Sequence, residues 1–574
     1  MDHNRFNVLI MIYLATLGTR YLVRCEVFTE SEQSAVDEMI KELMNCKRIP
    51  GLGLSITKGE KSLAKGYGVA DAEEGTPMTE DTVSCIGSTT KAFTSALLAA
   101  LITRDKSRGG SLSWMTTLRE IFGDDFGLTS DPVISSQVTL ADILSHRSGV
   151  ASADALLMAQ IYSESNRNLL LRQLHLIPKK GVFRGQFSYN NLMYSLAGLA
   201  AEAIGKKPYF ELLKEMILDP LGMDSAVLVD DLDFTLNTTS KPHQIINRSV
   251  QMSDTKFYRL GSFSPAGGIC MSPTDFNKWL FFLNSKGKTM SKKTIVDSMV
   301  FLDMVLPKQA LDILTQYAFG LYETFPEPSY TSWYGMGWFG RFYRANVDFF
   351  HGGSMFSYST VVVTDPNKQI GIAVTQNGLY PVSLERDLYP LAYYLKDILQ
   401  GHTPWLNKST ICSYPEPWRR SYPIQLPTQN VKEKYVGDSE EFAGTFGHSL
   451  FGEVKVTEKN GSLDLQWGNI IKGTLYDFVK KKINFKLRLR DETYQVIGYE
   501  LGSIDVVFHE KSSGKYMEVE IKFSKVMETY NFSRQISFFS PSTSSSTVKL
   551  HFHKTELCLL CTLLLILVNV FNSL

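Results

Sequence analysis

The sequence predicts an α/β fold followed by a small all-β domain. Three observations lead to this prediction. Residues 333–377 contain β-branched runs that are typical of strands. Residues 88–300 show helical spacing of apolar side chains, interrupted by Gly and Pro. Residues 433–525 are rich in alternating segments such as "KINFKLRLR" and "YMEVEIKF", which indicate further strands.

The individual elements follow in chain order. Residues 31–46 have the apolar spacing of a helix, with one face formed by Val36, Met39, Ile40 and Leu43. Residues 48–71 indicate two short strands around a Gly-containing turn. The stretch "YSTVVVTDPNKQIGIAVTQN" (358–377) predicts a hairpin whose two strands are joined by "DPNK". In the last β-rich region, Asn460-Gly461 is typical of a hairpin turn.

Length and composition set the domain organisation. The chain has 574 residues, 44% of them hydrophobic and 21% charged, which is enough for about two to four domains. We place the first domain at 30–405, a Pro-rich linker at 406–432 and the all-β domain at 433–530.

The N-terminus has the shape of a secretory signal over residues 1–25. One arginine precedes an apolar run at 8–17, and cleavage could follow Gly18 or Cys25. A short membrane anchor is the alternative. Because Arg20 interrupts the apolar character, we favour the signal.

The C-terminus, residues 541–574, combines the three parts of a GPI-attachment signal. Small residues at 542–546 precede a polar spacer at 547–556 and an apolar tail at 557–571. The tail is shorter than the roughly 20 residues of a membrane-spanning helix. We therefore favour GPI processing over two alternatives, a C-terminal membrane anchor and a secreted protein with an irregular C-terminal tail.

The cysteines and sequons fit an exported protein, secreted or GPI-anchored at the cell surface. If cleavage follows Cys25 and the tail is removed, four cysteines remain, namely Cys46, Cys85, Cys270 and Cys412. This even number allows one or two disulfides, whose pairing the sequence does not assign. Five N-x-[ST] sequons would accept glycans in that compartment, at Asn237, Asn247, Asn407, Asn460 and Asn531.

Several functional classes find no support. The 59 basic and 59 acidic residues balance, so no basic surface for nucleic acid is indicated. Ten scattered histidines without H-E-x-x-H give no zinc motif, and "GMGWFG" (335–340) precedes a strand-like run rather than a helix. We expect no metal, no cofactor and no nucleic-acid partner. The sequence also lacks the G-x-S-x-G elbow of α/β-hydrolases.

The candidate nucleophile lies in "IGSTTKAFTSALLAALI", where Ser88 and Lys91 are three residues apart. On a helix they share a face, and the apolar surroundings disfavour a charged lysine, which could then take the serine proton. Taken alone, an N-capping serine and a surface lysine are the better interpretation.

Two further segments change that interpretation. Tyr189 and Asn191 precede a second apolar helix, although a turn tyrosine and a capping asparagine would explain them equally. His351-Gly352-Gly353-Ser354 falls at the predicted start of a strand, where paired glycines allow close approach of a substrate, although a lone histidine is usually structural.

In this order, Ser-x-x-Lys, Tyr-x-Asn and His-x-Gly resemble the three motifs of the serine β-lactamase and penicillin-binding-protein superfamily. The likeness is to the branch of class C β-lactamases, D-aminopeptidases and esterases. The segments "IPGLGLSI", "VTLADILSHRSGV" and "PAGGICMSPTDFNKWL" agree with that branch. The resemblance covers about residues 36–399 and implies a β-lactamase-like fold, an antiparallel sheet flanked by helices with a helical subdomain. The all-β module resembles the C-terminal β-domain of some members.

The resemblance also implies roles. Ser88 would be the acylated nucleophile, Lys91 its base, and Tyr189 a second proton carrier. Asn191 would position the substrate, and the backbone N–H groups of Ser88 and Ser354 would form an oxyanion hole.

One departure from the pattern bears on the substrate. Where β-lactamases usually have Lys-Thr-Gly, this chain has His351 followed by Gly352 and Gly353, so the charge and hydroxyl that help hold a substrate carboxylate are missing. We therefore expect an extracellular serine hydrolase for a small amide, peptide or ester, rather than an enzyme whose main task is antibiotic hydrolysis. The alternative is a secreted binding or extracellular-matrix protein derived from such a hydrolase, with dispensable catalysis.

Overall fold

The computed structural model describes residues 26–538 apart from 247–248, 319–321, 324–325, 381–386, 419–438, 460, 478–482, 491–492, 495–497, 499–500 and 525–527. The chain divides into two compact units, Met1–Phe538 and Phe539–Leu574, and all described residues belong to the first. The signal predicted over 1–25 and the serine-rich tail predicted over 541–574 lie outside the described residues.

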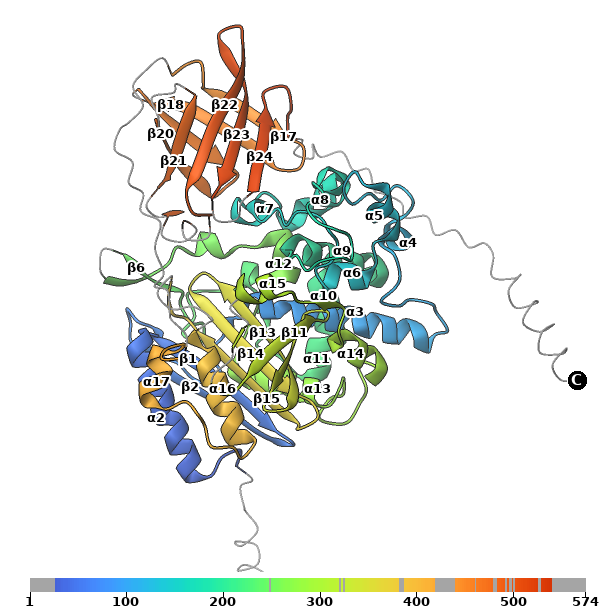
Figure 1. The fold of residues 1–574 in the computed structure, drawn as a ribbon, viewed down its shortest axis with the longest axis vertical. Coiled ribbons are helices and arrows are strands. Elements are labelled where there is room, and N and C mark those ends of the chain that lie inside the picture. Colours follow the sequence, from blue (N-terminus) through green and yellow to red (C-terminus); the bar gives the residue numbers. More distant parts are fainter. Residues whose placement is uncertain are drawn as a thin grey trace, which may run out of the picture. The chain divides into compact units, whose positions relative to one another are not determined.

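The first domain is built on an antiparallel ten-stranded sheet with the order β10-β11-β12-β13-β14-β15-β1-β2-β3, with β9 paired to β11 (Figure 1). Its strands are β1 (Gly51–Lys58), β2 (Lys61–Asp71), β3 (Thr76–Pro77), β9 (Gln309–Ala310), β10 (Tyr322–Glu323), β11 (Ser329–Tyr334), β12 (Phe339–Tyr343), β13 (Asn346–Met355), β14 (Tyr358–Asp365) and β15 (Ile370–Gln376). The chain therefore forms one sheet from its first strands and from strands some 300 residues later.

Helices cover both faces of this sheet, which is why its central strands are apolar on both sides. Helices α2 (Glu30–Lys47), α16 (Tyr389–Leu399) and α17 (Lys408–Ser413) form one layer (Figure 1). Helices α3 (Thr90–Ser107) and α13 (Pro273–Asn284) belong to the core on the other face. Every residue of β14 and β15 is buried.

The predicted helix near the N-terminus and the predicted hairpin are both confirmed. Helix α2 buries the four residues that the apolar spacing placed on one face, and a capping box at Thr29 starts it. Strands β14 and β15 pair across the "DPNK" connection. One detail is wrong: His351 and its glycines lie in the second half of β13, because the chain is already extended from Asn346 and pairs with β12.

The helical region lies between β4 (Ser84–Cys85) and the later strands. Helix α3 is buried from Thr90 to Ile102 and packs against α9 (Asn191–Gly205) and α12 (Ser264–Gly267). Around them lie α4 (Leu118–Phe122), α5 (Pro132–Gln137), α6 (Leu140–Leu144), α7 (Ala155–Met158), α8 (Arg167–Gln173), α10 (Tyr209–Leu213), α11 (Asp219–Leu221), α14 (Ser298–Val305) and α15 (Ile313–Ala318). Two short sheets complete this part, β4-β8-β5 and β16-β6-β7, formed by β5 (Val227–Leu228), β6 (His243–Ile246), β7 (Ser249–Met252), β8 (Ile269–Met271) and β16 (Leu379–Tyr380).

Two disulfides pair the four cysteines whose pairing the sequence left open. Cys85 bonds to Cys270 across the β4–β8 pair, directly before the Ser88 segment. Cys46 of α2 bonds to Cys412 of α17. Helix α17 lies within the segment predicted as the start of the linker, and the disulfide fastens it to the first domain.

The C-terminal all-β domain is a closed antiparallel barrel of eight strands, which confirms the predicted fold class. The strands are β17 (Gly444–His448), β18 (Gly452–Lys459), β19 (Ser462–Trp467), β20 (Ile471–Asp477), β21 (Asn484–Leu489), β22 (Ile504–Ser512), β23 (Lys515–Phe523) and β24 (Glu528–Ser533). Buried aromatic side chains fill it, among them Trp467, Phe508 and Phe532. In the part of the chain that the structure describes, no helix is long and apolar enough to cross a membrane.

Three of the five sequon asparagines are exposed, namely Asn237, Asn407 and Asn531. Asn247 and Asn460 lie outside the described residues.

Candidate active site

Ser88 lies in a 3₁₀ turn, Gly87–Thr89, that runs directly into α3. Strand β13 passes so close to this turn that side chains are excluded at two positions. A Cβ on Gly353 would lie 2.0 Å from the Ile86 oxygen, and one on Gly87, whose φ is +52°, would lie 2.7 Å from the Ser354 nitrogen. These two glycines therefore allow the backbone around Ser354 to lie beside Ser88.

Lys91 is fully buried one turn after Ser88, and three oxygens surround its amine. Its Nζ lies 3.0 Å from Ser88 Oγ, 2.8 Å from Asn191 Oδ1 and 2.8 Å from the Ala266 carbonyl oxygen. A neutral amine has two N–H groups and one lone pair. If the N–H groups bond to Asn191 and Ala266, the lone pair faces the Ser88 hydroxyl, which is the arrangement that a general base requires.

Asn191 is the first residue of α9, and its amide is held from both sides. Its oxygen accepts from Lys91, while its Nδ2 donates to Asp154 Oδ1 at 3.1 Å. The capping role that the sequence also allowed for Asn191 is taken by Asn190, whose side chain accepts from the Met193 N–H at 3.2 Å. Asn191 is therefore free of helix capping and oriented toward the lysine.

Tyr189 belongs to an aromatic cluster beside the lysine. The Lys91 Nζ lies 4.8 Å from the centre of the Tyr189 ring and 5.3 Å from that of Tyr194. The ring of buried His146 lies 4.4 Å from the ring of Tyr189, and its Nδ1 accepts from the Asn190 N–H at 3.0 Å. Burial, and the Lys91 charge after it, lower the pKa of His146 well below its ordinary value. His146 is thus a neutral packing partner of Tyr189.

His351 is also buried and neutral. Its Nε2 accepts from the Tyr334 hydroxyl at 3.1 Å, and its Nδ1 donates to the Gly352 carbonyl at 2.5 Å. Burial first, and then the Lys91 charge, lower the pKa of His351 to about 3. The imidazole therefore supplies no positive charge at the position where the related motif has lysine.

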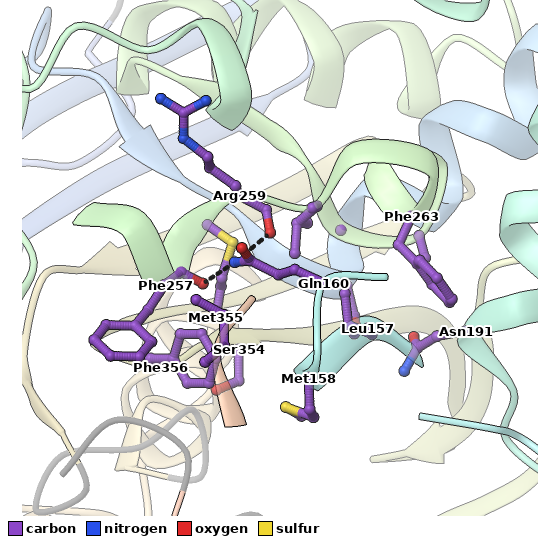
Figure 2. A pocket seen from close by; sticks show the side chains of 15 residues that line it. Leu157, Met158, Gln160, Asn191, Phe257, Arg259, Phe263, Ser354, Met355 and Phe356 are labelled. Atoms are coloured by element: carbon purple, nitrogen blue, oxygen red, sulfur yellow. Dashed lines mark hydrogen bonds between the residues drawn. The ribbon is translucent and has the colours of Figure 1, made fainter. Parts of the chain in front are cut away.

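A cavity of about 190 Å³ opens in front of Ser88, and Figure 2 shows its lining. Polar atoms come from Ser88, Asn191, Gln160, Arg259 and Ser354, and the Arg259 guanidinium points away from Asn191. The Gln160 amide donates to the carbonyls of Phe257 and Arg259, which ties the two walls together. The apolar lining consists of Leu157, Met158, Phe257, Leu260, Phe263, Ala266, Met355, Phe356 and the barrel residue Ile470.

The structure thus brings the residues predicted from the three motifs to one place. Ser88, Asn191 and Ser354 line the cavity, Lys91 contacts the first two, and Tyr189 lies beside the lysine. His351 and Gly353 lie on β13 and are absent from the described lining. Among the described residues, no group of three or more His, Cys, Asp or Glu side chains could hold a metal.

The family follows from a comparison with known proteins. Residues 36–395, more than half of the chain, match the family described as Beta-lactamase. This chain belongs to the beta-lactamase family. The resemblance to the serine β-lactamase and penicillin-binding-protein superfamily is thereby confirmed.

Curated relatives in the beta-lactamase family are distant. "Unguisins hydrolase ungD" of Aspergillus violaceofuscus is 27% identical over 360 residues, which are 59% of this chain and 60% of that protein. Gigasin-6 of Magallana gigas is 27% identical over 268 residues, 46% of this chain and 86% of that protein. Protein flp of Staphylococcus aureus is 25% identical over 356 residues, 61% of this chain and 64% of that protein. The chain spans about 60% of the length of the unguisins hydrolase.

Solved structures confirm the fold. The octameric penicillin-binding protein homologue from Pyrococcus abyssi has a TM-score of 0.54 at 18% identity, covering 88% of this chain and 100% of that chain. A D-amino acid amidase from Ochrobactrum anthropi SV3, in complex with L-phenylalanine, has a TM-score of 0.50 at 19% identity, covering 64% of this chain and 99% of that chain.

Some residues of the site were not predicted. The Ala266 carbonyl lies in "PAGGICMSPTDFNKWL" and His146 in "VTLADILSHRSGV", segments that agreed with the beta-lactamase family but suggested no role. Asp154 and Ile470 had no signal in the sequence, because only tertiary packing brings them to the site.

Proposed function

We propose that this protein is an extracellular serine hydrolase that forms an acyl-enzyme on Ser88 with a small amide, peptide or ester. The observation that carries the proposal is the arrangement of Lys91, whose Nζ lies 3.0 Å from Ser88 Oγ while Asn191 and Ala266 supply acceptors for its two N–H groups. Membership of the beta-lactamase family, a family of hydrolases, supports it.

In the acylation step, Ser88, Lys91 and Tyr189 account for every proton and bond that moves. Lys91 takes the Ser88 proton as Oγ bonds to the substrate carbonyl carbon, and the carbonyl electrons move onto its oxygen. In this proposal the backbone N–H groups of Ser88 and Ser354, which glycine-restricted packing brings close together, stabilise that oxyanion. The carbonyl then re-forms as the bond to the leaving amine or alcohol breaks, and the leaving group receives the proton through Tyr189. In the second step, a water molecule gives its proton through Tyr189 to Lys91 and attacks the acyl carbon. The bond to Ser88 Oγ then breaks, Lys91 returns a proton to Oγ, and the carboxylic acid leaves.

The cavity favours an uncharged, apolar acyl group. Nine apolar side chains line it, the Arg259 guanidinium points away from Asn191, and His351 is neutral and buried. A substrate carboxylate would therefore find no cation where the related Lys-Thr-Gly motif provides one, which disfavours β-lactam hydrolysis as the main task.

The extracellular location is supported by chemistry rather than by a targeting segment. Four cysteines form two disulfides, and disulfides persist in oxidising compartments. Three sequon asparagines are exposed. The GPI attachment and the signal remain predictions from the sequence.

The experiment is intact-mass analysis after treatment with a fluorophosphonate or penicillin-type acylating probe, together with turnover of a panel of amides, esters and β-lactams. We expect one adduct on the wild-type protein, mapped to Ser88, none on Ser88→Ala, and faster turnover of uncharged apolar esters and amides than of their carboxylated analogues.

The control is Ser62→Ala, which changes an exposed serine of β2 and should leave labelling unchanged. Labelling that persists in Ser88→Ala contradicts the proposal. A wild-type protein that neither labels nor turns over any substrate, yet binds a glycan or matrix protein, supports the binding-protein alternative instead.

A further inference from the structure

The barrel contacts residues 152–162 of the first domain, which we call the 152–162 segment. The Asn469 N–H donates to the Ala159 carbonyl at 2.9 Å, and the Asn469 side chain to the Gln160 carbonyl at 3.1 Å. The Tyr162 hydroxyl donates to the Leu450 carbonyl at 2.7 Å. This segment includes α7 and contributes three residues to the cavity lining, so the barrel helps to define the cavity wall.

The start of the segment is held by one barrel carboxylate, that of Glu528 in β24. The Ser152 hydroxyl donates to Glu528 Oε1 at 2.6 Å, and the Ala153 N–H donates to the same oxygen at 3.2 Å. The Tyr530 hydroxyl donates to the other oxygen. Only 8% of Glu528 is exposed, and among the described residues no basic side chain pairs with it. Burial of a carboxylate costs free energy unless hydrogen-bond donors replace the water molecules that it loses. The three donors therefore hold the Glu528 carboxylate in one position.

From this turn, a chain of hydrogen bonds leads to the base. Asp154 directly follows Ala153, and its Oδ1 accepts from Asn191 Nδ2 at 3.1 Å. The Asn191 oxygen accepts from Lys91 Nζ at 2.8 Å, and that nitrogen lies 3.0 Å from Ser88 Oγ. Without Asp154, the Asn191 amide could rotate and present its NH₂ group to the lysine.

We propose that Glu528 and Asp154 are positioning residues of the hydrolase site: Glu528 fixes the turn at Ser152 and Ala153 so that Asp154 orients Asn191, which in turn holds Lys91 toward Ser88. The inference rests on the proposed function and assigns to the barrel a part in it. The barrel is then a component of the site, and removal of one of its carboxylates slows the chemistry that Ser88 performs.

The charges around Asp154 fit this arrangement. Burial first, and then the Glu528 charge, raise the pKa of Asp154 to about 6, while Asn191, Lys91 and Ser152 oppose the increase. Tyr530 also faces this pair, and burial and the Glu528 charge raise the pKa of its hydroxyl, which keeps it a donor. Because burial opposes ionisation of Asp154, the hydrogen bond from Asn191 helps to compensate for the water that this carboxyl group loses.

The test compares Glu528→Ala, Glu528→Gln and Glu458→Ala for the rate constant of Ser88 acylation and for the probe concentration at half-maximal rate. Loss of this support should slow maximal acylation in Glu528→Ala about tenfold, which corresponds to one hydrogen bond of about 1.4 kcal/mol. The half-saturating concentration should change less than about threefold, because the cavity stays formed. Glu528→Gln retains an acceptor oxygen and should stay within about threefold of wild type. Glu458→Ala changes an exposed barrel residue and should be unchanged.

The outcomes separate the two proposals. If wild-type Ser88 labels and folded Glu528→Ala labels at the same maximal rate, the positioning role is wrong while the hydrolase proposal stands. If Glu528→Gln is as slow as Glu528→Ala, orientation by an acceptor oxygen is also wrong. If the wild type does not label, the hydrolase proposal fails, and a crystal structure of Glu528→Ala decides the geometric link. An unchanged contact of 2.8 Å between Asn191 Oδ1 and Lys91 Nζ would overturn it, and a lengthened one would support it.

Discussion

The side-chain oxygen of Asn191 lies 2.8 Å from the amine of Lys91, across one hundred residues of sequence. This contact connects the helix that begins beside the candidate nucleophile with the helix that begins beside Tyr189. The same amine contacts the Ala266 carbonyl oxygen and lies 3.0 Å from Ser88 Oγ.

Lys91→Ala should nearly abolish acylation while Ser88 remains in place. General-base catalysis contributes about 10²- to 10⁴-fold, so we expect a loss of that size in the acylation rate constant. Stopped-flow labelling with an acylating probe measures it. The matched control is Lys61→Ala, an exposed lysine of β2. Acylation of Lys91→Ala within threefold of wild type would exclude the lysine as base.

Gly353→Ala should reduce both stability and acylation, because its Cβ would lie 2.0 Å from the Ile86 oxygen and would push β13 away from the Ser88 turn. Overpacking of this kind costs about 1–3 kcal/mol. Urea unfolding measures the stability and probe labelling the activity. Gly127→Ala is the control, since its Cβ would meet only His175, at 3.3 Å or more, and should cost under about 1 kcal/mol. Equal stability of the two variants would contradict the close approach.

His351 should make the fold sensitive to acid. Its pKa is lowered to about 3 in the folded protein against 6.5 for the free side chain, so the unfolded chain binds the proton first. The stabilisation is complete above pH 6.5 and is lost as the pH falls toward 3. We expect His351→Gln to lose less unfolding free energy than wild type between pH 7 and pH 4, by urea titration. His175→Gln changes an exposed histidine and should follow the wild-type curve. Since burial also lowers the pKa of His146, the variant should retain part of the dependence.

Asp154 should change the stability of the fold with pH in the opposite direction to His351. The pKa of Asp154 is raised from 3.8 to about 6 in the folded protein. Its contribution to the free energy of unfolding is therefore complete below pH 3.8 and is lost as the pH rises through 6. The difference corresponds to about 3 kcal/mol. Asp154→Asn retains an oxygen for Asn191 but cannot ionise, and should therefore be more stable than wild type at pH 7.5 by up to that amount, with little gain at pH 4. Thermal melts at the two pH values measure this. A variant less stable than wild type at pH 7.5 would contradict it.

Loss of either disulfide should lower the stability of the fold, but loss of only one should lower the rate of acylation. Replacement of either pair by serines should cost about 2–4 kcal/mol of unfolding free energy. Only loss of Cys85–Cys270 should also slow acylation, because β4 leads directly into the Ser88 turn, whereas Cys46–Cys412 joins α2 to α17. Each double variant serves as the control for the other in unfolding and labelling assays. Equal acylation rates in both would show that the β4–β8 bridge does not position Ser88.

Local patterns in the sequence were sufficient to predict α2 and the β14–β15 hairpin, because each depends on residues close together in the chain. The Ser88–Lys91 pair was predicted only when the distant segments of Tyr189 and His351 were considered with it. The strand containing His351 was predicted to start too late, since the residues before it become recognisable as strand only when paired with β12. Glu528 could not be predicted at all. It lies 376 residues from its partner Ser152, and a glutamate at the start of an alternating segment has the pattern of any surface strand.

The bond between Cys46 and Cys412 has a consequence for the effect of proteolysis. It closes a covalent ring around the whole sheet and helical region, and its two cysteines are 366 positions apart in the sequence. A protease that cuts once anywhere inside this ring leaves two pieces still joined, with Ser88 and His351 held in one molecule. A single cut between α17 and β17 is different, because no disulfide among the described residues spans it. Such a cut leaves the barrel, with Glu528 and Ile470, attached to the first domain by noncovalent contacts only.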